Sequence, residues 1–364
     1  MTIQNSHSIT WERQIIIAIP VCNEEEYITP CLLSLARQST LPEKVILWVN
    51  NTTDRTCDRI NSITNTLPFE LEIVEVTYPQ ALASAGLARR DAMASAARYA
   101  SPDALLLTTD ADSEVAEDWI DRTLEAFARY PVEAVFGRAL LLPSEARKIP
   151  FHLHEDEKAE QAYGALLEHI TSLLHPEPHD PWPRHLEHSG ASIAVTYQAW
   201  RKVGGIPRVP TGEDRQFYQA LCRQNIPVRH APEVVVYVSA RLAGRAQGGM
   251  AETLARRLLA QDEYIDEIFE PVSQRMLRIR RKLLHNQLSL TKSLGISATE
   301  VPLVRIRRDE LSRHHKRAQR VLNWLKQEKH HLPHDLPWSA DDQFDTPPLA
   351  LPDPVASDIH DRLG

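Results

Sequence analysis

The sequence lacks an apolar run of the roughly 20 residues that a helix needs to cross a bilayer. Its polar start, residues 1–13, also lacks the apolar core of a secretion signal. The four cysteines form no Cys-x-x-Cys pair and no zinc spacing with histidine, which excludes a disulfide framework and the common zinc sites. We therefore expect a cytoplasmic protein with reduced thiols.

Two phosphate-binding patterns are absent as well. The chain has only 12 glycines, with no Gly-x-Gly-x-x-Gly after its first strand and no Walker loop, which argues against dinucleotide and P-loop enzymes. The formal net charge of -8 argues against a nucleic-acid partner.

Alternating strand and helix patterns dominate the first half of the chain. Apolar runs at 15–21, 44–49, 70–76 and 104–109 are separated by helical patterns, which predicts an α/β fold with a mostly parallel central sheet covered on both faces. A further strand is expected at 132–142, where Gly137 would allow close backbone approach.

Later segments continue this pattern and then change to helices. We expect a helix at 155–174, a short strand at 189–196, a helix at 215–224 and one or two strands at 228–238. Helices are then predicted at 250–269, 272–293 and 309–329. The expected domains are an N-terminal arm (1–13), a catalytic domain (14–248, with halves 14–112 and 113–248), a helical extension (249–330) and a Pro/Asp-rich tail (331–364).

The apolar run at 104–109 is followed by two carboxylates, Asp110 and Asp112, with a single residue between them. Open α/β sheets bind their ligands at the carboxyl ends of strands. Adjacent carboxylates repel each other, and Mg²⁺ or Mn²⁺ relieves that repulsion while also holding a diphosphate. The alternative is a polar turn in which Asp112 or Ser113 caps a helix at 114–129.

Six segments in the same order give a resemblance to family-2-like glycosyltransferases of the GT-A fold, and to their bacterial, non-processive members. They are 15–25 (ending Cys-Asn-Glu-Glu), 49–56 (Val-Asn-Asn-Thr-Thr-Asp-Arg-Thr), 86–92 (Gly-Leu-Ala-Arg-Arg-Asp-Ala), Asp110-Ala111-Asp112, 189–196 with 204–207, and Glu213-Asp214. Two departures matter. Asn50-Asn51 replaces a pair of acids, and the Gln-x-x-Arg-Trp box of processive synthases is missing.

The resemblance implies transfer of a single hexose from a nucleotide-sugar to the hydroxyl of a small or lipid-linked acceptor, with inversion as the expected outcome. It implies Mn²⁺ or Mg²⁺ at Asp110 and Asp112, with Arg89 favoured over Arg90 at the phosphates. Both arginines have the alternative of a solvated helix face. The implied donor-binding residues are Pro20, Asn23, Glu24, Asn51, Asp54, Arg89, Asp110 and Ala111.

The resemblance also implies a general base, Asp214, at the start of the acceptor-side helix. The alternative is that Glu213 and Asp214 only cap that helix. His185, His188 and Trp182 are either acceptor contacts or structural, and His230 is a further candidate metal ligand. The implied acceptor-binding residues are Gly190, Ala191, Glu213, His188 and Trp182, and a lid would contain Arg241 and Arg245.

Other functions stay open at this point. One is a retaining enzyme that resembles glucosyl-phosphoglycerate synthases, and another is a catalytically silent nucleotide-sugar-binding scaffold. The helices after residue 250 would pack on the catalytic core, form a homodimer or contact an anionic membrane through the basic stretch 275–281.

Overall fold

The computed structural model describes residues 13–209, 211–241, 255–259, 262–288 and 304–327. Met1–Gln327 forms one compact unit, and Glu328–Gly364 is a second unit that lies outside the described residues, as does the predicted tail. Among the described residues, no helix is both long and apolar enough to span a membrane.

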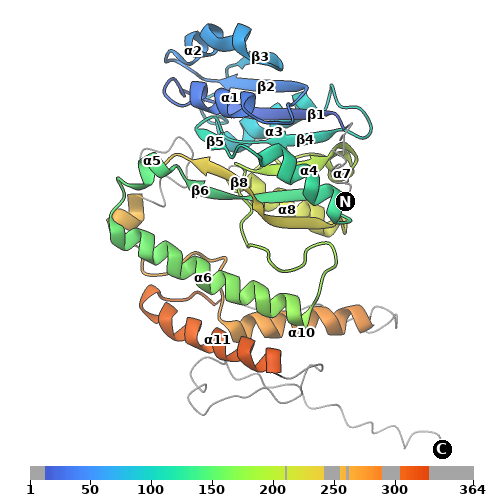
Figure 1. Cartoon of the computed structure of the whole chain (residues 1–364), viewed down its shortest axis with the longest axis vertical. Coiled ribbons are helices and arrows are strands. Elements are labelled where there is room, and N and C mark those ends of the chain that lie inside the picture. The colour runs from blue at the N-terminus through green and yellow to red at the C-terminus, as the bar shows by residue number, and fades with distance from the viewer. Residues whose placement is uncertain (1–12, 210, 242–254, 260–261, 289–303, 328–364) are drawn as a thin grey trace, which may run out of the picture. The chain divides into compact units, whose positions relative to one another are not determined.

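The first unit is built on one eight-stranded sheet with the strand order β3-β2-β1-β4-β7-β6-β8-β5 (Figure 1). The strands are β1 (Ile15–Val21), β2 (Lys44–Asn50), β3 (Glu70–Val76), β4 (Leu105–Thr108), β5 (Ser113–Val115), β6 (Ala134–Leu141), β7 (Ile193–Thr196) and β8 (Val228–Val238). The helices are α1 (Ile28–Ala36), α2 (Thr56–Ile63), α3 (Ala85–Ala96), α4 (Trp119–Arg129), α5 (Pro143–Ala146), α6 (Phe151–Leu174), α7 (Tyr197–Val203), α8 (Glu213–Arg223), α10 (Val272–Leu288) and α11 (Leu311–Gln327), with 3₁₀ turns η1 (Thr64–Thr66) and η2 (Arg308–Glu310).

The pairing confirms the predicted α/β fold with a mostly parallel central sheet. Strands β3, β2, β1 and β4 pair in parallel, so that their carboxyl ends share one edge of the sheet. Strand β7 runs antiparallel to β4 and β6, whereas β6 and β8 are parallel. The second half of the sheet is therefore mixed in direction.

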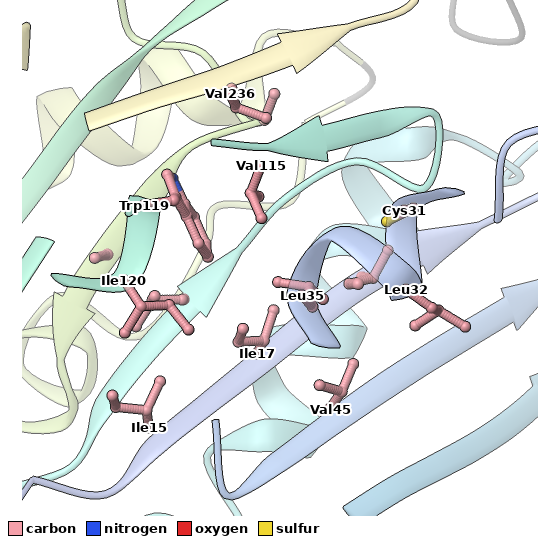
Figure 2. Packing of buried hydrophobic residues seen from close by; sticks show 14 of the residues in the cluster. Ile15, Ile17, Cys31, Leu32, Leu35, Val45, Val115, Trp119, Ile120 and Val236 are labelled. Atoms are coloured by element: carbon pink, nitrogen blue, oxygen red, sulfur yellow. The ribbon is translucent and has the colours of Figure 1, made fainter. Parts of the chain in front are cut away.

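Alternating side chains of β1 fill two separate cores, one on each face of the sheet. Ile15 and Ile17 point to the face covered by α1, α2 and α4, as Figure 2 shows for the α1 and α4 contacts. Ile16 and Ala18 point to the face covered by α3, α7 and α8. Because both faces are buried, β1 is a continuous apolar run, as a central parallel strand should be.

Two local predictions change in the structure, and a third becomes definite. Ser113–Val115 forms strand β5 against β8, so the helix predicted at 114–129 begins only at Trp119 and the capping role of Asp112 or Ser113 is wrong. The helix predicted at 250–269 is wrong over 262–269, where Tyr264 instead bridges Arg307. The stretch 228–238 is a single strand.

The predicted close approach at Gly137 is confirmed, because a Cβ there would lie 2.3 Å from the Ser192 Oγ. The helices of the extension pack against α6 (Figure 1). The Tyr163 hydroxyl on α6 donates a hydrogen bond to the Glu270 carbonyl at 2.8 Å. Helix α6 thus connects the sheet to α10 and α11.

Candidate functional site

The loops that follow β1 and β2 are locked together by side-chain hydrogen bonds. Asn23 has a positive φ of 54°, a conformation that asparagine tolerates better than most residues. Its side-chain oxygen accepts hydrogen bonds from the backbone N–H groups of Thr53 (2.7 Å) and Asp54 (3.2 Å). The Asp54 carboxylate in turn accepts hydrogen bonds from the N–H groups of Glu25 and Thr56. These contacts shape the loops, and direct donor contacts by Asn23 and Asp54 stay predictions.

Asn51 has a comparable structural engagement. Its φ is 48°, and its side-chain amide exchanges two hydrogen bonds with the backbone of Tyr78, at 2.8 and 3.0 Å. Each amide atom keeps one further hydrogen-bonding position. Recognition of a base by Asn51 stays a prediction.

Arg89 on α3 joins the two halves of the predicted site. Its side chain is only 5% exposed, and its Nη2 donates to Asp110 Oδ1 at 2.6 Å while its Nε donates to Glu213 Oε1 at 3.0 Å. Its Nη1 donates to the Gly190 carbonyl at 2.8 Å. Burial alone would lower the pKa of Arg89, but Asp110 and Glu213 outweigh it and raise the pKa. The solvated-face alternative is wrong for Arg89, whereas Arg90 is half exposed and pairs with Asp91.

Two glycines make room for this arrangement. A Cβ on Gly190 would lie 2.7 Å from the Arg89 guanidinium, and one on Gly86 would lie 2.8 Å from Glu213 Oε2. A Cβ closer than 3.0 Å to another heavy atom would force one of the two groups to shift. Because Gly86 and Gly190 have no side chains, they leave room for the ion pair between Arg89 and Glu213.

Asp214 lies beside this ion pair in the first turn of α8. Its Oδ2 accepts a hydrogen bond from the Gly190 N–H at 3.0 Å, and its Oδ1 accepts one from the Arg215 N–H at 2.7 Å. Burial, followed by the neighbouring Glu213, raises the pKa of the Asp214 carboxyl. Such a carboxylate binds a proton more readily than an ordinary aspartate does.

Asp112 is paired with a cation from the segment that follows β8, the strand that pairs with β5. Arg241 Nη2 lies 2.8 Å from Asp112 Oδ2, and its guanidinium makes a bidentate contact with Glu24 at 2.8 and 3.1 Å. The Ser239 hydroxyl donates to Asp112 Oδ2 at 2.8 Å. Despite these partners, burial and the charge of Asp110 raise the pKa of Asp112 to about 6.

These carboxylates suit a hard divalent cation that shares its ligands with a diphosphate. Among the described residues, no three or more His, Cys, Asp or Glu side chains converge closely enough to hold a metal ion by themselves. Mg²⁺ bound through one or two carboxylates plus substrate phosphates needs no such cage. The Arg241 guanidinium bridges Asp112 and Glu24, so these two carboxylates already bind one positively charged group. Asp110 and Asp112 therefore fit the predicted metal.

The predicted lid is only partly described. Arg241 directly follows the Ser239-Ala240 segment, whereas Arg245 lies outside the described residues. The Ala240 N–H donates to Glu145 Oε2 at 2.6 Å, which attaches this segment to α5.

The histidines gather away from Asp112. His230 lies nine residues before Ser239 on β8, roughly 25–30 Å along an extended strand, and its Nδ1 donates to Asp180 Oδ2 at 2.8 Å. His185 and His188 lie beside it, with ring centroids 5.7 and 5.1 Å away. Burial lowers the pKa of His188 to about 3, so the ring is neutral. The candidate role of His230 as a ligand of this metal is wrong.

Asp180 holds this group together. It is 3% exposed and takes an ion pair from Arg229 at 2.9 Å. Burial would raise its pKa, but the hydrogen bond from His230 and the nearby cations hold it down to about 2. Trp182, two residues later, stacks on His169 of α6 with centroids 4.5 Å apart. The acceptor roles of His188 and Trp182 stay predictions.

The remaining candidates lie near these groups on the sheet. Pro20 is the sixth residue of β1, Ala111 is buried between the two aspartates, and Ala191 follows Gly190. Sequence reasoning missed Ser239, because its contact with Asp112 depends on the pairing of β5 with β8. It also missed Thr108, whose hydroxyl accepts from Arg89 at 3.2 Å.

Comparison with known proteins gives a family match and several similar folds. Residues 16–172 match the family model described as "Glycosyl transferase family 2", which confirms the resemblance to family-2-like glycosyltransferases. No curated protein matches the chain. Solved structures that are similar include mannosyltransferase PcManGT from Pyrobaculum calidifontis with GDP-Man and Mn²⁺ (17% identity, 78% of this chain and 77% of that one, TM-score 0.47). A second is S. aureus TarS 1-349 with UDP-GlcNAc (16% identity, 87% of this chain and 93% of that one, TM-score 0.47). A third is glucosyl-3-phosphoglycerate synthase from Mycobacterium tuberculosis with Mn²⁺, UDP and phosphoglyceric acid (16% identity, 69% of this chain and 78% of that one, TM-score 0.40).

Proposed function

Because residues 16–172 match the model of glycosyl transferase family 2, we propose that this chain transfers a single hexose from a nucleotide-sugar to an acceptor hydroxyl, with inversion and with the help of Mn²⁺ or Mg²⁺. The observation that carries the proposal is the contact of Arg89 with both Asp110 and Glu213. This contact brings the metal-binding candidates after β4 beside the acceptor-side carboxylates of α8.

On the donor side, Asp110 and Asp112 would hold the metal together with the diphosphate. A divalent metal supplies charge neutralisation for the leaving nucleoside diphosphate. Arg241, now paired with Asp112 and Glu24, is close enough to turn toward the diphosphate as part of a lid. Arg89 holds the Asp110 carboxylate in place through an ion pair at 2.6 Å.

On the acceptor side, Asp214 would act as the general base. It takes the proton of the acceptor hydroxyl while that oxygen bonds to the anomeric carbon and the bond to the diphosphate breaks. Its raised pKa supports this role, because a general base works best with a pKa near the operating pH. Gly190 fixes one carboxylate oxygen through its N–H.

The base assignment is tested by Asp214→Asn. We expect the rate of transfer to fall by about 10²–10⁴-fold, while the thermal shift caused by the nucleotide-sugar with Mn²⁺ is retained. Asp58→Asn, another acid in the first turn of a helix, is the matched control and keeps wild-type turnover. Full turnover in Asp214→Asn with intact donor binding would remove Asp214 as the base.

The donor and the stereochemistry need separate measurements. Thermal-shift screening of UDP- and GDP-sugars with and without Mn²⁺ identifies the donor, because a bound donor stabilises the fold by mass action. NMR of the first product then gives the anomeric configuration. A product with retained configuration would overturn inversion and favour the retaining alternative. No stabilisation by any nucleotide-sugar would contradict the proposed function itself.

A further inference from the structure

Two helices of the extension concentrate positive charge. Helices α10 and α11 each contain five Lys or Arg residues and no Asp or Glu, although the whole chain has a formal net charge of -8. Such a separation of charge attracts an anionic partner to one part of the surface, even where the protein as a whole is acidic. An anionic partner would therefore approach the extension.

Helix α10 uses part of its charge inside the protein. Arg275 forms ion pairs with Glu168 of α6 and with Glu270, and Arg278 pairs with Glu270 as well. Two of the four arginines in the stretch 275–281, which the sequence singles out for membrane contact, are therefore neutralised within the protein.

Helix α11 is amphipathic and presents a row of cations to solvent. The side that packs on α6 contains the buried residues Leu311, His314, Ala318 and Leu322. At about 100° per residue, the opposite side contains Arg313, Lys316 and Arg320, all of them exposed. These three residues form what we call the basic ridge, which extends about 10 Å along the helix. Figure 1 shows α6 between the sheet and α11, so the ridge belongs to the outer layer of this unit.

The basic ridge has no acidic partner. None of its three side chains forms an ion pair or a hydrogen bond with any other residue that the structure describes. Arg305 and Lys326, which precede and follow the ridge in the chain, are also exposed and form no ion pair with a described residue. Trp324 is half-buried and lies next to Arg320 on the helix surface, because residues four apart are neighbours there.

This combination of groups fits the surface of an anionic bilayer. Four to eight Lys or Arg residues on an amphipathic helix attract anionic lipid headgroups, and tryptophan is enriched at the level of the headgroups. Nucleic-acid-binding domains usually have a positive net charge, whereas this chain carries its excess of cations on one helix surface only. A bilayer needs only that surface, because the repulsion by acids farther away is screened beyond about 8 Å at physiological ionic strength.

We propose that the basic ridge docks this protein on an anionic lipid bilayer, with α11 parallel to the membrane and Trp324 at the level of the headgroups. The attraction is electrostatic, so the contact is reversible and sensitive to salt. It does not depend on the proposed transfer reaction.

The test is sedimentation of the full chain with vesicles of phosphatidylcholine and phosphatidylserine, compared with vesicles of phosphatidylcholine alone. We expect binding to the mixed vesicles only. Binding should weaken with salt, because the Debye length falls from about 30 Å at 0.01 M to about 8 Å at 0.15 M. Each basic residue near the membrane changes the partition constant about fivefold. Replacing Arg313, Lys316 and Arg320 together by Gln should therefore lower it about 100-fold.

The matched control replaces Arg59, Arg98 and Arg129 by Gln, which removes the same net charge from exposed positions on or next to α2, α3 and α4. We expect this control to bind the mixed vesicles as the wild type does. Both triple variants should keep the wild-type midpoint of urea unfolding, because the replaced side chains are exposed. Lys316→Gln alone, with an expected fivefold loss, gives a second measurement that makes the smallest change to the fold.

Three results would overturn the proposal. Equal binding by the ridge variant and the control would show that the ridge is not the docking surface. Absence of binding to the mixed vesicles at the lowest salt would exclude membrane docking, and the thermal shift with nucleotide-sugars would still test the transfer reaction separately. Ridge-dependent binding of a labelled RNA, with no binding to vesicles, would assign the ridge to a nucleic acid instead.

Discussion

Asp112 and Asp180 are both aspartates with little exposure, yet their surroundings push them in opposite directions. Burial and the carboxylate of Asp110 raise the pKa of Asp112 to about 6. Asp180 is also buried, but His230 and two arginines hold its pKa at about 2. At Asp180 the neighbouring cations outweigh the effect of burial on the pKa, whereas at Asp112 Arg241 does not. This difference separates a carboxylate that stabilises the fold from one that is available for a ligand.

The largest effect is expected from Asp112→Asn, which should lower transfer by about a thousandfold, because the metal–diphosphate contact loses a charged ligand. Stability should not fall with it. The folded-state pKa of Asp112 lies above its unfolded value, so the ionised carboxylate destabilises the fold above pH 6. Asparagine removes that cost. Urea unfolding at pH 8 without metal checks this, and a loss of more than about 2 kcal/mol would make Asp112 a structural residue.

Asp180→Asn should show the reverse pattern. Removing this charge takes the closest carboxylate away from Arg229, whose side chain is only 2% exposed, and this costs about 3–5 kcal/mol. Urea unfolding at pH 7 measures this loss. Asp118→Asn is the control, because its ion pair with Arg122 is about half exposed and contributes under about 1 kcal/mol. Equal stability of the two variants would contradict the assigned difference.

A smaller effect is expected from acidification through His188. Its folded-state pKa of about 3 lies below the unfolded value, so its contribution to stability is present above about pH 6.5 and is lost as the pH falls toward 3. Between pH 7 and 5 this lowers the free energy of unfolding by about 2 kcal/mol. His188→Phe should therefore lose about 2 kcal/mol less than the wild type over that interval.

Asp112 titrates over part of the same range with the opposite sign, so the difference between wild type and His188→Phe is the quantity to measure. His152→Phe, at an exposed position on α6, serves as the control and should follow the wild type. Parallel pH profiles for His188→Phe and wild type would show that the His188 ring is not a buried neutral group.

The smallest effect concerns Arg241, which occupies the cation position at Asp112. Its side chain is 20% exposed, and an ion pair of this kind contributes about 0.5–1 kcal/mol. Arg241→Gln should therefore bind Mn²⁺ about threefold more tightly when no donor is present, as measured by calorimetric titration. Weaker binding would mean that Arg241 supports the metal site instead of competing for it.

The sequence identified candidate residues for this site but did not indicate how they contact each other. The apolar run before Asp110 placed that residue at the edge of the sheet, and the resemblance singled out Arg89 and Glu213. Nothing in their spacing indicated that Arg89 would bridge the two, because 124 residues separate Arg89 from Glu213. Contacts of that kind depend on the antiparallel placement of β7 beside β4.

The errors have a similar origin. Residues 113–115 continue the helical pattern of the residues after them, but pairing with β8 draws them into a strand. The same pairing brings Ser239 to Asp112, which no local pattern indicates. In the extension, residues 262–269 have a helical spacing of apolar residues, yet Tyr264 pairs with Arg307. In each case a long-range contact overrides a weak local preference.

The room that Gly86 and Gly190 leave around the ion pair of Arg89 with Glu213 bears on how such sequences diverge. A side chain at position 190 would meet the guanidinium, and one at position 86 would meet the carboxylate. The four positions should therefore change together in evolution, because contacting residues co-vary. A homologue with a larger residue at position 190 should have given up the arginine at position 89, and with it the link between the two carboxylate pairs.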